Sequence, residues 1–197
     1  MTIIINSPST DVTELRSETL QAEGYEIDMA ECWKIYNMLG IQIFPSELYS
    51  ISAFKQYFKD KIFFDIGASV GSWSAFALMY GAKEVYAFDP LPDDRVSATD
   101  NYNRLVTKVN NTATTLDWFS NYFKVVPDII KIDVEGDEVE VLKGAKETLK
   151  SKPLLMIEAH NKDLIRQVID LIGEPAKVVK HNLINGVTYH MFYLYDN

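Results

Sequence analysis

The sequence has little cysteine, little histidine and no long apolar run. Cys32 is the only cysteine, which excludes an internal disulfide framework and a cysteine-based zinc site. No apolar run approaches the ~20 residues that a membrane-spanning helix needs. The N-terminus also lacks the basic start and the long apolar stretch of a secretory signal. We therefore expect a cytoplasmic protein without a membrane partner.

Basic residues are scarce as well. The 19 Lys and Arg residues are outnumbered by 28 Asp and Glu residues, so the formal net charge is −9. Because nucleic-acid phosphates are bound by clustered Lys and Arg, we expect no nucleic-acid partner. Hydrophobic residues still make up 47% of the 197 residues, which is an ordinary value for a folded globular chain.

The first 60 residues are predicted to form a region of their own. Residues 1–28 hold six acids and one base, which is typical of a solvated arm. From residue 28 onward, apolar side chains recur at helical spacing, first around Trp33 and then around Phe54. We expect an arm and helices over residues 1–60 that pack on a core domain of residues 61–197.

Within the core domain, short apolar runs alternate with segments of helical periodicity. Such alternation predicts right-handed crossovers and a mostly parallel sheet covered by helices. At the C-terminus, Asn185-Gly186 separates two further strand-like runs, which is typical of an antiparallel hairpin. The expected fold class is therefore α/β, with a mostly parallel sheet that ends in a hairpin. The predicted strands are 61–66, 85–88, 128–132, 153–157, 178–184 and 187–195.

A glycine-containing turn, from Asp65 to Gly71, follows the first of these strands. The small residues Gly67 and Ala68 let a ligand approach the backbone closely, and the next helix offers unpaired N–H groups. Asp89 ends the second strand, where a carboxylate can bind both hydroxyls of a ribose. Together these features predict an adenosine-containing ligand at the carboxyl edge of the sheet.

Two ligand classes compete for this pattern. A dinucleotide site requires the spacing G-x-G-x-x-G, whereas Gly67 and Gly71 are four residues apart. The carboxylate of Asp65 would repel a pyrophosphate, but it suits a cation such as the amino or sulfonium group of S-adenosylmethionine. The C-terminal hairpin also favours a methyltransferase over a nicotinamide-dependent oxidoreductase. We therefore expect S-adenosylmethionine as the cofactor.

A second group of polar residues follows the later strands. Asp133 and Glu135 come after the strand at 128–132, and Glu158 and His160 follow the next apolar run. Because neighbouring parallel strands end at one edge, we expect these four side chains to converge near the glycine turn. They could supply a general base or hold a divalent metal, but we predict no metal site.

Four nearby polar residues have ordinary structural explanations. Asp137 and Glu138 are expected to cap backbone N–H groups and to favour the start of a helix. His181 and His190 fall in the predicted hairpin and are expected to be ordinary strand residues.

The chain shares five segments with a known enzyme family. They are FFDIGASVGSWS at 63–74, VYAFDP at 85–90, TTLDWF at 114–119, PDIIKIDVEGDEVEVLKGA at 127–145 and PLLMIEAH at 153–160. In this order they resemble the FkbM family of S-adenosylmethionine-dependent methyltransferases. The resemblance implies a Rossmann-like class I fold and methylation of a hydroxyl on a small molecule, sugar or secondary metabolite.

The resemblance also implies a donor site at the glycine turn. Asp65, Gly67, Ala68 and Gly71 would line the methionine and ribose part of the donor. Asp89 would hold the ribose hydroxyls, at a position where the family more often has Glu.

The residues after the later strands also match the family: Asp133 and Glu135 match its acids, and Glu158 with His160 matches its E-x-H pattern. An alcohol is a poor nucleophile at neutral pH, so a base should assist the transfer. His160 and Glu135 are the candidates for this base, and Asp133 is expected to orient the donor or the substrate. The acceptor would be a small molecule or a glycan.

One departure from the family keeps a second function open. Only 26 residues lie between Asp89 and Leu116, which is short for the family, and residues 1–60 and 91–113 match none of its segments. The adenine pocket is normally built partly from that stretch. The alternative is therefore a binding or regulatory module that keeps the fold and has lost catalysis.

Overall fold

The computed structural model describes residues 4–6, 20–22, 25–27, 54–69, 71–89, 109–110, 114–183 and 186–194. In the first 60 residues these include the strands β1 (Ile4–Asn6), β2 (Leu20–Ala22) and β3 (Tyr25–Ile27) and the 3-10 helix η1 (Lys55–Tyr57). The helix predicted around Trp33 lies outside the described residues. No helix within the described ranges is long and apolar enough to cross a membrane.

Four parallel strands form the centre of the sheet, as the apolar runs predict. They are β4 (Ile62–Ile66), β5 (Glu84–Asp89), β7 (Ile129–Ile132) and β8 (Leu154–Ala159). β4 lies between β5 and β7, and β8 pairs with β7. The short strand β6 (Val109–Asn110) pairs in parallel with the end of β5. The carboxyl ends of these strands therefore meet at one edge of the sheet.

The C-terminal hairpin joins the sheet as the sequence predicts. β9 (Lys177–Leu183) and β10 (Gly186–Tyr193) pair antiparallel, and β10 lies between β8 and β9. The full strand order is β1-β9-β10-β8-β7-β4-β5-β6. Residues 184–185 of the predicted turn lie outside the described residues. The α/β fold class, with a mostly parallel sheet and a C-terminal hairpin, is confirmed.

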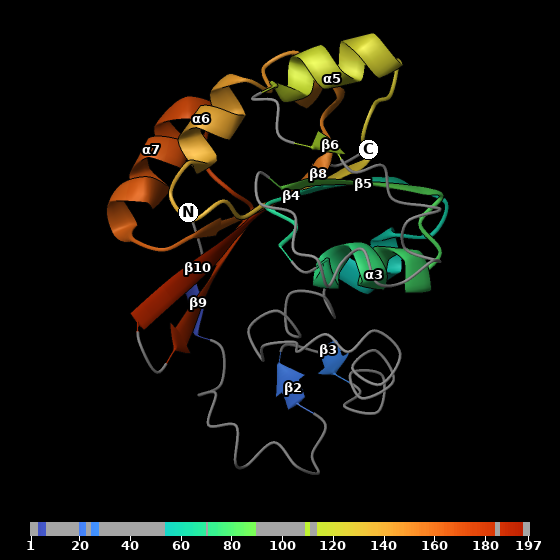
Figure 1. Cartoon of the computed structure of the whole chain (residues 1–197). Coiled ribbons are helices and arrows are strands. Elements are labelled where there is room, and N and C mark those ends of the chain that lie inside the picture. The colour runs from blue at the N-terminus through green and yellow to red at the C-terminus, as the bar shows by residue number, and fades with distance from the viewer. Residues whose placement is uncertain are drawn as a thin grey trace.

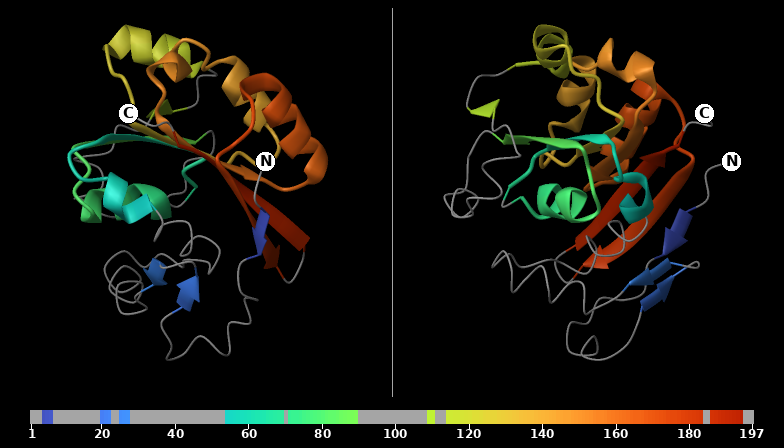
Figure 2. Two further views of the ribbon diagram at one scale, coloured as in Figure 1. Left: turned by 180° about the vertical axis from the view of Figure 1, so that it is seen from behind. Right: turned by 90° about the vertical axis from the view of Figure 1, so that its right-hand side faces the viewer.

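Helices cover both faces of the sheet (Figure 1). α3 (Ser72–Met79) lies on one face, and α5 (Leu116–Phe123), α6 (Glu138–Lys143) and α7 (Lys162–Ile172) lie on the other, as Figure 2 also shows. Successive residues of β4 serve opposite layers. Phe63 belongs to the apolar cluster that includes Phe76 of α3, and the ring of Phe64 lies 5.6 Å from that of Phe119 in α5. A strand buried on both faces is mostly apolar, which explains the short apolar run in the sequence, with Asp65 as the one charged residue of β4.

The helix that begins after Asp137 is short in the structure. α6 ends at Lys143, and the 3-10 helix η3 (Thr148–Ser151) follows after a turn. The carboxylate of Asp117 accepts hydrogen bonds from the backbone N–H groups of Glu147 (3.1 Å) and Thr148 (2.8 Å). Because a side chain from α5 binds these N–H groups, they do not extend α6.

Candidate active site

The glycine turn leaves β4 and lies against the ends of both neighbouring strands. The backbone N–H groups of Gly67 and Ala68 donate to the carbonyl oxygen of Phe88 at 2.8 and 3.1 Å. Gly67 has φ +74°, and a Cβ atom there would lie 1.7 Å from the carbonyl oxygen of Asp133. Only glycine fits this position, because both the backbone conformation and the contact with the chain after β7 exclude a side chain.

Asp89 lies beside the glycine turn, as predicted from its place at the end of β5. Its Oδ2 accepts a hydrogen bond of 2.7 Å from the backbone N–H of Ser69. Ser69 and Gly71 have positive φ angles of 47° and 86°, and Gly71 is the N-cap of α3. The structure therefore brings four of the five predicted donor-binding residues, Gly67, Ala68, Gly71 and Asp89, into one place.

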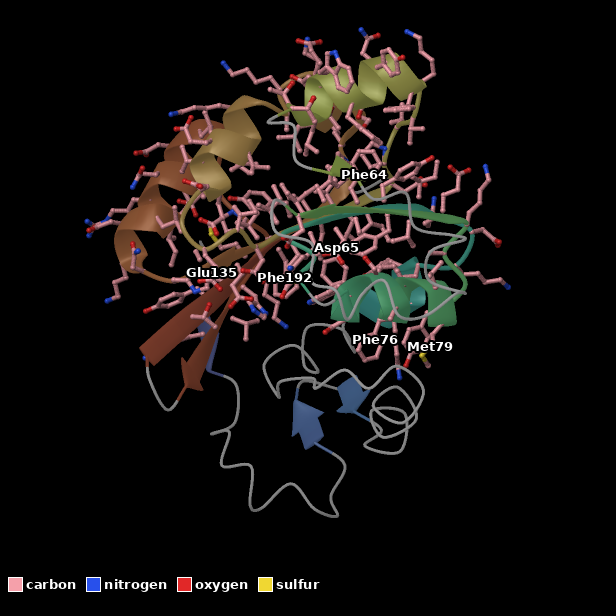
Figure 3. All side chains as sticks on the ribbon, in the orientation of Figure 1. Phe64, Asp65, Phe76, Met79, Glu135 and Phe192 are labelled. Carbon is pink, nitrogen blue, oxygen red and sulfur yellow. The ribbon has the colours of Figure 1, made fainter. Side chains whose placement is uncertain are left out.

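Asp65, the fifth predicted donor-binding residue, lies beneath the turn rather than at its surface. Its side chain is fully buried (Figure 3), and its Oδ2 accepts a hydrogen bond of 2.6 Å from the hydroxyl of Ser74 in α3. Burial raises the pKa of Asp65, and the nearby ammonium of Lys131 opposes this rise. The expectation that this carboxylate faces the ligand is not met, because its partners enclose it.

Lys131 links the glycine turn to the acidic residues after β7. Its Nζ donates to the carbonyl oxygen of Gly67 at 3.0 Å and lies 3.0 Å from Asp133 Oδ2 and 3.7 Å from Asp65 Oδ1. Burial alone would lower the pKa of this ammonium, but the two carboxylates raise it above its usual value. Our interpretation of the sequence missed Lys131, although a lysine inside an apolar strand is itself a signal that it has charged partners.

His160 and the acids after β7 come together, as expected. The Nε2 atom of His160 lies 3.7 Å from Asp133 Oδ1 and 3.5 Å from Glu135 Oε2. Asp133 is the largest cause that raises the pKa of His160, to about 9, so the ring is a cation at neutral pH. Asp133 itself has its pKa lowered by Lys131 and His160, against the effect of burial.

Glu158 is held by two side chains of β10. Its Oε2 lies 2.9 Å from His190 Nε2, and its Oε1 accepts a hydrogen bond of 2.8 Å from the hydroxyl of Thr188. His190 is 1% exposed. The expectation of an ordinary strand residue is correct for its backbone, but its side chain belongs to the polar group of the candidate active site. The side chain of His181 lies outside the described residues.

At the start of α6, the side chain that accepts hydrogen bonds from backbone N–H groups is that of Glu138 and not that of Asp137. Asp137 is the N-cap, but its side chain makes no capping hydrogen bond. The buried Glu138 accepts hydrogen bonds from the N–H groups of Val134 (3.1 Å) and Gly136 (3.2 Å). These two residues flank Glu135, which has φ +56° and an 86% exposed side chain. Glu138 thereby stabilises the conformation that presents Glu135 at the edge of the sheet (Figure 3).

Three of these side chains are close enough together to hold a metal ion. One ligand atom each from Asp133, Glu158 and His160 lies within 4.8 Å of the other two. Each carboxylate is, however, already paired, Asp133 with Lys131 and Glu158 with His190 and Thr188. The described residues therefore satisfy their own charges, and the absence of a metal site stays a prediction.

The charge of His160 leads to a prediction about stability. The pKa of His160 rises from about 6.5 in the unfolded chain to about 9 in the folded one. Its stabilising contribution is then complete below pH 6.5 and is lost as the pH rises through about 9. The melting temperature of the wild type should exceed that of His160→Gln at pH 6, and the difference should shrink by pH 10. An equal difference at both pH values would contradict the assignment.

Residues 95–177 match the family model described as the methyltransferase FkbM domain. The resemblance to the FkbM family is confirmed. The matched range contains β7, α6 and β8, and so also Asp133, Glu135 and His160. It also covers residues 95–113, for which we expected no counterpart, so that expectation is wrong.

Three proteins similar to this chain are named as methyltransferases. The hexuronic acid methyltransferase AglP of Haloferax volcanii is 24% identical, with 73% of this chain and 72% of the relative covered. The precorrin-6y C5,15-methyltransferase of Geobacter metallireducens has a TM-score of 0.56 at 18% identity, over 76% of this chain and 87% of its own. The Bacillus subtilis tRNA methyltransferase TrmK has a TM-score of 0.54 at 15% identity, over 72% and 63%. The fold is thus the Rossmann-like class I fold, and the chain is a methyltransferase.

Proposed function

We propose that the chain transfers a methyl group from S-adenosylmethionine to a hydroxyl of a small molecule or glycan. The observation that carries the proposal is the placement of Asp89 against the glycine turn, at the same edge of the sheet as His160. Parallel sheets bind their ligands at this edge. One end of this edge then binds the donor, and the other end assists the acceptor.

The donor site in this proposal consists of the turn and Asp89. Gly67, Ala68 and Gly71 allow close approach to the backbone, and the partly exposed carboxylate of Asp89 binds the ribose hydroxyls. Asp65 does not touch the donor in this proposal, because Ser74 and Lys131 enclose its carboxylate beneath the turn. The donor, when bound, supplies a methyl group already activated on a sulfonium.

The base in this proposal is His160. The carboxylates of Asp133 and Glu135 lie 3.7 and 3.5 Å from its Nε2 and favour a proton on that nitrogen, so Nδ1 is the nitrogen we propose as the acceptor of the hydroxyl proton. With a pKa of about 9, roughly one molecule in a hundred carries a neutral ring at pH 7. As the new O–C bond forms, the C–S electron pair stays on sulfur and the hydroxyl proton moves to Nδ1.

The acceptor class rests on charge and on one relative. A net charge of −9 opposes binding to an RNA backbone, although the fold also occurs in a tRNA methyltransferase. The relative that matches 73% of the chain is named for a sugar acid. A glycan or small-molecule hydroxyl is therefore the acceptor we propose.

Isothermal titration of the purified chain tests the donor assignment. We expect micromolar binding of S-adenosylmethionine and S-adenosylhomocysteine and no binding of NAD. His160→Gln should leave this affinity unchanged, because His160 lies outside the donor site. Binding of NAD alone would favour an oxidoreductase, and binding of none of the three would favour a non-catalytic binding module.

A further inference from the structure

A buried ammonium joins two parts of the candidate active site that come from different strands. The side chain of Lys131 is 4% exposed, and its Nζ contacts one carbonyl oxygen and two carboxylates. The carbonyl belongs to Gly67 in the glycine turn. The carboxylates are those of Asp65, below the turn, and Asp133, beside His160. Lys131 is thus the described cation that reaches both parts.

The glycine turn and the chain after β7 also touch directly. The backbone N–H of Asp133 donates to the carbonyl oxygen of Ile66 at 3.0 Å, and Gly67 leaves no room for a Cβ atom against Asp133. A shift at either place must therefore move the other. The hydrogen bond from Lys131 to the Gly67 carbonyl fixes the turn in the conformation that this contact requires.

Lys131 also compensates the charges of two carboxylates. Asp65 Oδ1 is buried and has no hydrogen-bond partner among the described residues, so the ammonium 3.7 Å away is its compensating charge. The two carboxylate oxygens of Asp133 face different partners: Oδ2 faces Lys131 and Oδ1 faces His160. A buried carboxylate that loses its cation is strongly destabilised.

We propose that Lys131 is a positioning residue that holds the donor turn through the Gly67 carbonyl and shares Asp133 with His160. The first half rests on the proposed donor site, and the second half concerns only the charge of His160. Removal of Lys131 then has two separate effects. The donor turn loses a hydrogen bond, and Asp133 is left to His160 alone, which makes the imidazolium harder to deprotonate.

The groups that face this region from each packed element all enter the second effect. They are Asp65 on β4, Asp133 and Glu135 after β7, Glu158 on β8, His160 after β8 and His190 on β10. Among these groups Lys131 faces Asp65 and Asp133, the ring of His160 faces Asp133 and Glu135, and His190 faces Glu158. Removal of Lys131 therefore shifts the titration of His160 upward.

The experiment compares Lys131→Met with Lys61→Met. Both variants lose one lysine charge, but Lys61 is half exposed and pairs with Asp128 at the opposite end of β4. Lys131→Met should weaken the binding of S-adenosylhomocysteine by about tenfold or more. It should also raise the pKa of His160, read from its imidazole proton resonance, by roughly one unit. Lys61→Met should leave both quantities unchanged.

A third variant separates the two effects. Lys131→Gln removes the charge but keeps an N–H donor for the Gly67 carbonyl. It should recover part of the donor affinity and still show the raised His160 pKa. If both Lys131 variants bind the donor as the wild type does and leave the His160 pKa unchanged, the proposal is overturned.

Two further outcomes are distinguishable: the wild type binds no donor, or the Lys131 variants do not fold. If the wild type binds no donor, the proposed function fails, while the His160 titration still decides whether Lys131 shares Asp133. If the Lys131 variants do not fold, the ¹⁵Nζ resonances of the wild-type lysines replace them. A Lys131 ammonium that exchanges slowly and stays protonated beyond the other lysines supports the proposal, and rapid exchange overturns it.

Discussion

Gly67→Ala should abolish donor binding and strongly destabilise the fold. A Cβ atom would lie 1.7 Å from the carbonyl oxygen of Asp133, and the residue has φ +74°. Relief of the clash must separate the glycine turn from β7, which breaks the hydrogen bond between Asp133 and Ile66. We expect a loss of about 3 kcal/mol or more in the free energy of unfolding. Urea denaturation measures this loss, and titration with S-adenosylhomocysteine measures the affinity.

Gly81→Ala is the matched control. Gly81 also has a left-handed backbone, φ +83°, but the nearest atoms to its Cβ would lie at an ordinary 3.8 Å, in Lys59. It should cost only the backbone strain, about 1 to 2 kcal/mol, and leave donor affinity intact. Equal effects of the two substitutions would show that strain, and not contact with β7, makes glycine necessary at position 67.

Asp89→Ala should weaken donor binding by about a hundredfold or more while the fold persists. The substitution removes the carboxylate proposed to bind the ribose hydroxyls, and a hydrogen bond to a charged group contributes about 1.5 to 3 kcal/mol. It also removes the 2.7 Å hydrogen bond from the Ser69 N–H, which holds the glycine turn to the end of β5. The measurement is isothermal titration with S-adenosylmethionine.

Glu84→Ala provides the comparison for Asp89→Ala. Glu84 begins the same strand and carries the same charge, but it lies at the opposite edge of the sheet, next to Lys83. Donor affinity should not change in this variant. An affinity of Asp89→Ala within twofold of the wild type would remove Asp89 from the donor site.

The core of the fold could be predicted from sequence pattern because each strand carries its own signal. Runs such as 61–66 and 128–132 are mostly apolar because the strands are buried on both faces, and Asp65 and Lys131 are the charged exceptions within the strands β4 and β7. The hairpin follows from a local turn signal and two strand-like runs. The end of α6 could not be predicted. The backbone N–H of Glu147, beyond that end, donates to the carboxylate of Asp117, which lies in a helix 30 residues earlier in the chain.

The candidate site was predictable where chemistry follows directly from chain position. Asp89 ends a strand and Gly67, Asp133 and His160 each follow one, and parallel strands end at one edge. What such reasoning could not supply is the partner of each charge. Asp65 was expected to face a ligand, whereas Ser74 and Lys131 enclose it.

The sequence by itself determined the strands, their mostly parallel arrangement and the edge at which the polar residues gather, since these follow from local periodicity and chain order. Only the tertiary structure decided which charges meet. Lys131 in β7 reaches Asp65 in β4, 66 residues earlier in the chain, and His190 reaches Glu158 across an antiparallel pair. Electrostatic pairing depends on distances of 3 to 4 Å between residues far apart in the chain, and sequence spacing does not encode those distances.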